Sequence, residues 1–225
     1  MRGRHARGPA DDGPGVSRPA AGGGRWVQVD PERLQGWLDG FARRHGAVVR
    51  EAGDAVVRLT AEDGSVAEVQ VPFPPLEHGL VEHVLRDRRV GVLLVRLGGC
   101  ACGVFDGPRL VASKVTVRQV HGRSAAGGQS QQRFARRREG QVRVMLQAAA
   151  DTAARVLLPA AGTLDAVVVG GERTAVDGVL ADRRLAPLRA LVQGPLLDVP
   201  DPRQPVLEAS YDGLRAVRIR VVDPA

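Results

Sequence analysis

The segment from residue 110 to residue 158 constrains the fold most, because it joins a strand pattern to one long helix through a glycine-rich loop. Pro159 and Gly162 should end this helix. Gly140 interrupts it at a cost of about 1 kcal/mol relative to alanine, so the basic first turns can move against the apolar remainder. Apolar side chains recur from residue 130 to 158 at the spacing of a helix that buries one face: Phe134, Val142, Met145, Leu146, Ala149, Ala153, Val156 and Leu157.

The loop before this helix carries an ordered string of glycine, glutamine and arginine. Residues 121–123 read His-Gly-Arg, 127–130 read Gly-Gly-Gln-Ser and 133–136 read Arg-Phe-Ala-Arg, with Ser-Ala-Ala inserted at 124–126. Adjacent glycines can adopt positive φ and bring backbone amides close to a crowded group. The Gln129 amide can donate and accept hydrogen bonds, which suits it to orient a water and a developing oxyanion. It cannot act as a general base, because an amide does not titrate near neutral pH.

The loop admits other interpretations. Among 28 glycines a bare Gly-Gly-Gln can arise by chance, as a surface turn between a strand and a helix. Residues 128–132 approach the Gly-x-Ser-x-Gly elbow of esterases but lack its final glycine, and no Asp-then-His order follows. We expect His121 to pack or to face phosphate rather than to act as a base.

With its flanks, the string resembles the catalytic tip of the class-1 peptide chain release factors of archaea and eukaryotes. The resemblance covers about residues 110–169 and implies their central domain, a mixed α/β unit of ribonuclease-H-like type. It also implies hydrolysis of the ester between a nascent peptide and the tRNA 3′ end. Gln129 would then place the water, and Gly127 and Gly128 would shape the loop.

The chain is too short to add both the stop-codon-reading and the GTPase-binding domains of those factors, and it lacks an Asn-Ile-Lys-Ser string. It is therefore more similar to the stand-alone VLRF branch (acVLRF family), peptidyl-tRNA hydrolases of ribosome-associated quality control. These free nascent chains from tRNA on stalled or split large ribosomal subunits. Two alternatives remain open at this stage: cleavage of tRNA near its 3′ CCA end, and a non-catalytic module that binds ribosome or tRNA.

Charge supports an RNA partner. Between Arg109 and Arg143 nine basic residues stand against the single acid Glu139, while the remaining 23 basic and 24 acidic residues nearly cancel. The net charge of +7 is thus concentrated at the loop, where phosphates would bind. Because only seven aromatic residues occur, base stacking is a poor explanation of binding. The predicted RNA-binding residues are Lys114, Arg118, His121, Arg123, Ser130, Arg133, Arg136, Arg137 and Arg138.

Several classes of protein are disfavoured. The chain has no apolar run of 18 residues and no signal-peptide core, so we expect a cytoplasmic protein without a membrane partner. Cys100 and Cys102 share one face of a strand and should be buried apolar residues rather than a disulfide. His78 and His83 lie five residues apart, off the helical spacing of metal-binding pairs. We expect a monomer with no metal, no cofactor and no nucleotide.

The predicted organisation is a disordered Arg/Gly-rich tail over residues 1–24 and one release-factor-like catalytic domain over residues 25–225, with an N-terminal helix and hairpin extension. The tail offers too little apolar surface to offset its ordering entropy. The fold class is mixed α/β, a mixed sheet with packed helices. The expected helices are 31–46, 79–87, 130–158 and 174–181; the expected strands are 55–60, 66–71, 90–97, 102–105, 110–120, 165–169, 206–210 and 214–222.

Overall fold

The structure, a computed structural model, describes residues 18–117 and 130–224, and for residues 130–137 it describes the backbone alone. The chain divides into two compact units. The first unit extends to Val84 and also contains the segment from Ala216 onward; the second runs from Leu85 to Arg215. The sequence predicted one domain over residues 25–225. The C-terminal segment belongs to the first unit because the last strand, β10, pairs with two of its strands.

The first unit is an antiparallel sheet with helices on one face. The strand order is β1-β2-β10-β5-β4-β3, and every pair is antiparallel. Its elements are β1 (Arg18–Pro19), β2 (Arg25–Val29), a short 3-10 turn (Pro31–Arg33), α1 (Leu34–His45), β3 (Val48–Ala52), β4 (Val56–Ala61), β5 (Val66–Gln70), α2 (Leu80–Leu85, whose last residue begins the second unit) and β10 (Val217–Val222).

The predicted helix of residues 31–46 is confirmed, as the 3-10 turn followed by α1, and its apolar side chains pack on this sheet. Leu34 and Phe41 are fully buried, and Trp37 stacks on Phe41 with ring centroids 5.6 Å apart. Gly46 ends the helix at a φ of 87°, a conformation that favours glycine. The predicted hairpin of residues 55–60 and 66–71 is also confirmed, as β4 and β5.

Residues 18–24, which the sequence assigned to a disordered tail, form a strand and a turn. Arg18 pairs with Trp26 in the β1–β2 ladder, and residues 20–24 form the turn between these strands. The guanidinium of Arg220 donates to the carbonyls of Gly22 and Gly23 at 2.8 and 3.1 Å, which holds the turn. Residues 1–17 lie outside the described part of the chain.

The second unit has a mixed sheet in the order β8-β7-β6-β9. Three strands form an antiparallel meander: β6 (Arg89–Arg96), β7 (Gly99–Asp106) and β8 (Arg109–Val117). β9 (Ala166–Gly171) lies parallel to β6, and residues 192–197 extend the sheet beyond β9 through two parallel bridges. The predicted mixed α/β class is confirmed, and the strand order fits the ribonuclease-H-like type.

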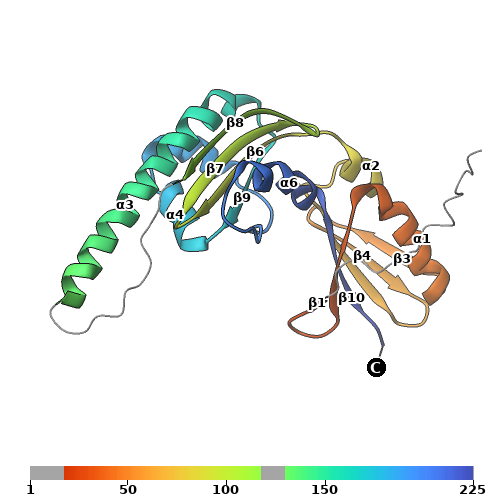
Figure 1. Cartoon of the computed structure of the whole chain (residues 1–225). Helices are drawn as coiled ribbons and strands as arrows, with labels where there is room; N and C mark the ends of the chain where they lie inside the picture. The colour runs from red at the N-terminus through yellow and green to blue at the C-terminus, as the bar shows by residue number, and fades with distance from the viewer. Residues whose placement is uncertain (1–17, 118–129, 225) are drawn as a thin grey trace, which may run out of the picture. The chain divides into compact units, whose positions relative to one another are not determined.

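Helices cover both faces of this sheet (Figure 1). On one face lie α3 (Ser130–Leu157), α4 (Arg173–Leu180) and α5 (Ala186–Ala190), with 3-10 segments at Leu158–Thr163 and Arg183–Leu185. On the other lies α6 (Gln204–Arg215), whose Tyr211 ring is 5.2 Å from that of Phe105. The helix α3 continues through Gly140 without a break.

One predicted element is wrong. Residues 206–210 are not a strand of a closing hairpin but part of the helix α6. Leu207, Ser210 and Leu214 are buried on one helical face, and this spacing outweighs the turn signal of Tyr-Asp-Gly. The other half of the predicted hairpin is correct, since β10 covers residues 217–222 and pairs with β2 and β5 instead.

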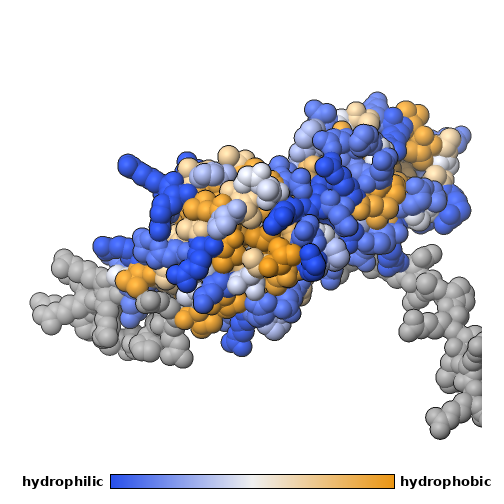
Figure 2. Space-filling model, turned by 90° about the horizontal axis from the view of Figure 1, so that it is seen from above, coloured by the Kyte–Doolittle hydropathy of each residue, from blue (hydrophilic) through white to orange (hydrophobic). Residues whose placement is uncertain are grey.

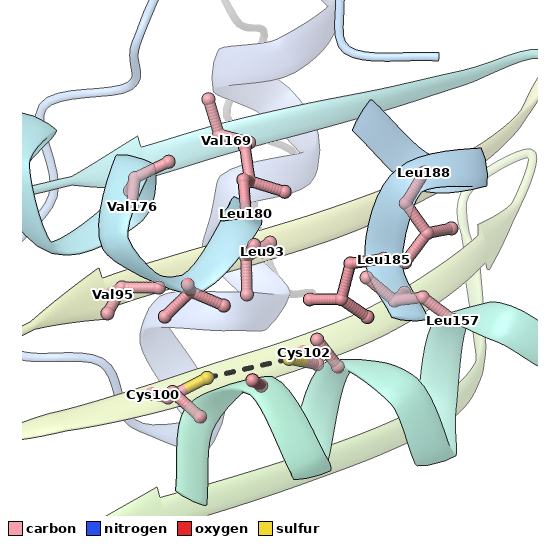
Figure 3. Packing of buried hydrophobic residues seen from close by; sticks show 14 of the residues in the cluster. Leu93, Val95, Cys100, Cys102, Leu157, Val169, Val176, Leu180, Leu185 and Leu188 are labelled. Carbon is pink, nitrogen blue, oxygen red and sulfur yellow. Dashed lines mark hydrogen bonds between the residues drawn. The ribbon is translucent and has the colours of Figure 1, made fainter. Parts of the chain in front are cut away.

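The core between the sheet and α3 includes the two cysteines (Figure 3). Cys100 and Cys102 are buried with their sulfur atoms 3.5 Å apart, so they are free thiols, as predicted. The contact with Cys100, together with burial, raises the pKa of the Cys102 thiol well above its usual range. Both thiols therefore act as small apolar core residues.

Gly171 closes β9 where no side chain fits. Its φ is +98°, and a Cβ there would lie 2.2 Å from the carbonyl oxygen of Val95. We predict that Gly171→Ala lowers the free energy of unfolding by about 1 to 3 kcal/mol, measured by urea denaturation. Gly213→Ala is the matched control, because a Cβ there meets no atom within 4 Å. Equal stability of the two variants would contradict the assignment of strain to Gly171.

Candidate nucleic-acid interface

The predicted site residues fall into three groups. Lys114 and Arg138 are described with their side chains, and both are exposed. Ser130, Arg133, Arg136 and Arg137 lie in the first turns of α3, where the backbone alone is described. The remaining residues lie outside the described part of the chain: Arg118, His121, Arg123, Gly127, Gly128 and Gln129.

The two elements that flank the loop are described, and a hydrogen bond joins the end of β8 to the second half of α3. The Thr116 hydroxyl at the end of β8 lies 2.9 Å from the Thr152 hydroxyl of α3. Thr152 donates its own proton to the carbonyl of Ala148, so Thr116 is the donor between the hydroxyls. A helix rises 1.5 Å per residue, which places Ser130 about 33 Å along α3 from Thr152. The first half of α3 therefore projects past the end of the sheet (Figure 1).

The second half of α3 is anchored in the core. Its buried apolar residues are Met145, Ala149, Ala150, Ala153 and Leu157. The alanines bring the helix close to the sheet, and Leu146 packs on α4 where Gly178 has no side chain. Among residues 138–144 none is buried, and Val144 is 51% exposed. The boundary between the anchored and the projecting half lies just before Met145.

An ion-pair cluster fastens α3 from the side. Arg184 lies 2.7 Å from Asp151 on α3 and 2.7 Å from Asp182, which also accepts from the backbone N–H of Arg184. Hydrogen bonds from Arg184 lower the pKa of Asp182 to about 2 and lower that of Asp151 as well. Because neighbouring Leu185 and Leu188 are fully buried, the cluster links α3 to a fixed part of the core.

Exposed arginines mark the projecting half of α3. Arg138 and Arg143 are exposed there, with only Glu139 as an acid between them. Figure 2 shows hydrophilic residues, with hydrophobic ones among them, beside the grey loop. Lys114 lies elsewhere: it precedes Thr116 by two residues on the same face of β8, next to the anchored half of α3. The structure does not bring Lys114 together with Arg138.

Two further arginines lie on the edge of the sheet from which the loop leaves. β6 ends at Arg96, β8 ends at Val117, and α4 begins at Arg173 just after β9. The register pairs both Arg96 and Val117 with Gly99, so these strand ends share one edge. Ligands of open α/β sheets bind at this edge. Arg96 donates to the carbonyl of Val199 at 2.9 Å, and Arg173 is exposed.

The described residues offer no group of three or more His, Cys, Asp or Glu side chains that could hold a metal ion. His83 is buried and has a structural role. Its Nδ1 accepts a hydrogen bond from the N–H of Glu77, and its Nε2 donates one to the carbonyl of Pro72. Within residues 18–117 and 130–224, no helix has the length and apolarity needed to cross a bilayer.

Comparison with protein families decides the classification. A family model described as Actinobacteria/chloroflexi VLRF1 release factor matches residues 88–220. The chain belongs to this family. The matched span runs from β6 through the loop and α3 to β10, so VLRF1 membership confirms the resemblance recognised in the motif and assigns the chain a release-factor-related role in translation.

Solved structures with some similarity include an archaeal translation termination factor, aRF1, at 15% identity and a TM-score of 0.44. A second, titled "Archaeal protein", has 18% identity and a TM-score of 0.37. The matches cover 84% and 67% of this chain, and they span 66% and 48% of those two chains. No curated protein sequence matches this chain.

Phosphate binding by the exposed arginines of the projecting half can be tested with an exposed arginine of the anchored half as the control. We predict that Arg138→Gln with Arg143→Gln weakens tRNA binding and reduces the slope of log affinity against log salt by about 0.7 to 0.9 per lost phosphate contact. Arg155→Gln, exposed on the anchored half, should leave the slope unchanged. Fluorescence anisotropy over a salt series measures both. An equal slope for all three proteins would show that Arg138 and Arg143 contact no phosphate.

The ion-pair cluster predicts a dependence of stability on acid pH. In the folded protein the pKa of Asp182 is lowered from 3.8 to about 2. The ionised carboxylate therefore stabilises the fold fully above pH 4, and this stabilisation is lost as the pH falls toward 2. We predict that Arg184→Gln reduces the loss of stability between pH 4 and pH 2, followed by urea denaturation at each pH. Arg183→Gln, an exposed neighbour, is the control and should keep the parent profile. Identical profiles for both variants would contradict the coupling.

Proposed function

We propose that this chain is a peptidyl-tRNA hydrolase that releases nascent chains from tRNA on stalled or split large ribosomal subunits. The observation that carries the proposal is the Gly-Gly-Gln string at residues 127–129 within the span matched by the VLRF1 release-factor model. The arrangement of its flanks supports it. The string directly precedes α3, a helix with one half anchored in the core and the other half projecting.

The proposed reaction needs a positioned water rather than a strong base. The water oxygen attacks the carbonyl carbon of the ester, and the bond from that carbon to the tRNA 3′ oxygen breaks. The peptide leaves as a carboxylate, the tRNA recovers its 3′ hydroxyl, and one proton passes to solvent. Gln129 orients the water and stabilises the oxyanion through its amide, while Gly127 and Gly128 let the loop approach the ester.

Arginines supply the binding energy in this proposal. Arg123, Arg133, Arg136, Arg137 and Arg138 contact phosphates of the peptidyl-tRNA and of ribosomal RNA in the large subunit. Arg138 is exposed on the projecting half of α3, as such contacts require. Guanidinium groups bind phosphate in a bidentate manner, so the helix can be held in a fixed orientation. The protein would act as a monomer in the cytoplasm, where ribosomes are found.

We predict that Gln129→Ala lowers the rate of peptide release from peptidyl-tRNA on isolated large subunits by about 100- to 1000-fold. The affinity for the subunit should stay within twofold of the parent, because the amide acts on the reacting atoms rather than on phosphates. Single-turnover release of labelled peptide measures the rate, and co-sedimentation measures the affinity.

Gln131→Ala is the matched control, because it removes the same amide two residues further along the chain. It should release peptide at the parent rate. If Gln129→Ala also retained the parent rate, Gln129 would have no part in the mechanism.

A further inference from the structure

The sheet of the first unit has one covered face and one open face. Along β4 and β10 buried residues alternate with exposed or half-buried ones, so each strand turns one set of side chains to the core and the other to solvent. The core of this unit collects the buried set together with Leu34 and Phe41 of α1. No strand residue on the opposite side is buried in the described part of this sheet. We refer to that side as the open face.

Registered pairs define a row of side chains across all six strands of the open face. Neighbouring members lie directly opposite each other on adjacent strands, and successive residues of the row come from β1, β2, β10, β5, β4 and β3: Arg18, Trp26, Arg220, Glu68, Arg58 and Glu51. Valine side chains flank it on one side, at Val49, Val66 and Val222. Val49 is 66% exposed.

The planar groups of the open face are held in place. The guanidinium carbon of Arg218 lies 4.8 Å from the centre of the Trp26 ring, a cation–π contact. Arg220 is fixed by Glu68 at 3.3 Å and by the carbonyls of the β1–β2 turn. Arg58 reaches the same carboxylate at 3.4 Å and keeps half of its side chain exposed. Flat cationic and aromatic groups are thus presented on a rigid sheet.

The charge of the open face favours a partner that carries phosphate groups. Four arginines stand there among the described residues, at positions 18, 58, 218 and 220, against two carboxylates at positions 51 and 68. Arginine planes and aromatic rings stack on unpaired bases, while the guanidinium edges bind phosphate. A duplex hides its bases, so it would use only part of this surface.

We propose that the open face of the first unit binds a single-stranded segment of ribosomal RNA, as a second RNA-contacting surface in addition to the loop and α3. The choice of ribosomal RNA over tRNA as the partner of this face rests on the proposed function, in which the loop and α3 already bind the tRNA. Unpaired bases stack on Trp26 and Arg218, and Arg58 contacts the backbone. Composition argued against stacking, but one of the two tryptophans stands on this solvent-facing side.

The direct test measures binding of a fluorescent oligouridine 12-mer by anisotropy. Full-length protein with Arg136, Arg137 and Arg138 replaced by glutamine serves as the background, so that the loop and α3 contribute little to the binding of the oligonucleotide. Arg58→Gln with Arg218→Gln should weaken binding about tenfold. Arg50→Gln is the matched control: it lies in the same sheet but is paired with Leu59 on the covered side, and it should change binding less than twofold.

A spectroscopic readout tests stacking independently of charge. Trp37→Phe leaves Trp26 as the sole tryptophan, and oligouridine should quench its emission in proportion to binding. Thermal melts confirm that each variant is folded, and Arg58→Gln alone is used where the double variant melts early. Equal binding by the face variants and Arg50→Gln, or no quenching at saturating RNA, would overturn the proposal.

The source of the RNA is tested with the otherwise unmodified chain. Arg58→Gln with Arg218→Gln should leave the affinity for deacylated tRNA within twofold and should remove ultraviolet crosslinks between the first unit and ribosomal RNA on isolated large subunits. Equal loss of tRNA affinity would assign the face to tRNA, and crosslinks to a ribosomal protein would assign it to protein; either overturns the proposal. Peptide release with excess enzyme reports on the proposed function separately.

Discussion

The burial of one face of α3 against the mixed sheet is the interaction on which the rest of the candidate site depends. Full burial of a side chain such as Met145 or Leu157 stabilises a fold by about 1.5 to 3 kcal/mol, and the alanines between them allow close packing. The Thr116–Thr152 hydrogen bond fixes the position along α3 at which the end of β8 contacts the helix. With the second half held this way, the first half projects, and its described arginines, Arg138 and Arg143, are exposed.

Local patterns explain how much of the fold could be predicted from the sequence. The helices α1 and α3 follow from apolar periodicity, and the strand β6 follows from a continuous apolar run that is buried throughout. The division into two units could not be predicted in this way, because it depends on where β10 inserts among strands more than 140 residues earlier. The helix α6 was missed because only two leucines, Leu207 and Leu214, mark its buried face, and Tyr-Asp-Gly at 211–213 carries a turn signal.

In the candidate site too, local features could be predicted from the sequence, whereas features that depend on long-range packing could not. The string around Gln129 is contiguous, so the sequence alone was enough to recognise it, and the VLRF1 match extends over all but the first three residues of the unit that carries it. Lys114 is close in sequence to the loop, yet it lies beside the anchored half of α3, because Thr116 two residues further along β8 is hydrogen-bonded to Thr152. The positions of Arg96 and Arg173 depend on which strand ends share an edge of the sheet. The pairing of Arg184 with Asp151 depends on how the segment Arg183–Leu185 packs beside α3. The sequence displays neither arrangement.

The central claim is that the projecting helix carries the Gly-Gly-Gln loop to the ester of a peptidyl-tRNA. Analysis of both products tests it most directly, using the unmodified chain and isolated large subunits that carry a labelled peptidyl-tRNA. The account predicts free peptide together with tRNA of full length that can be charged again at its 3′ end. A shortened tRNA, or peptidyl-tRNA that persists in the presence of excess bound protein, would contradict it.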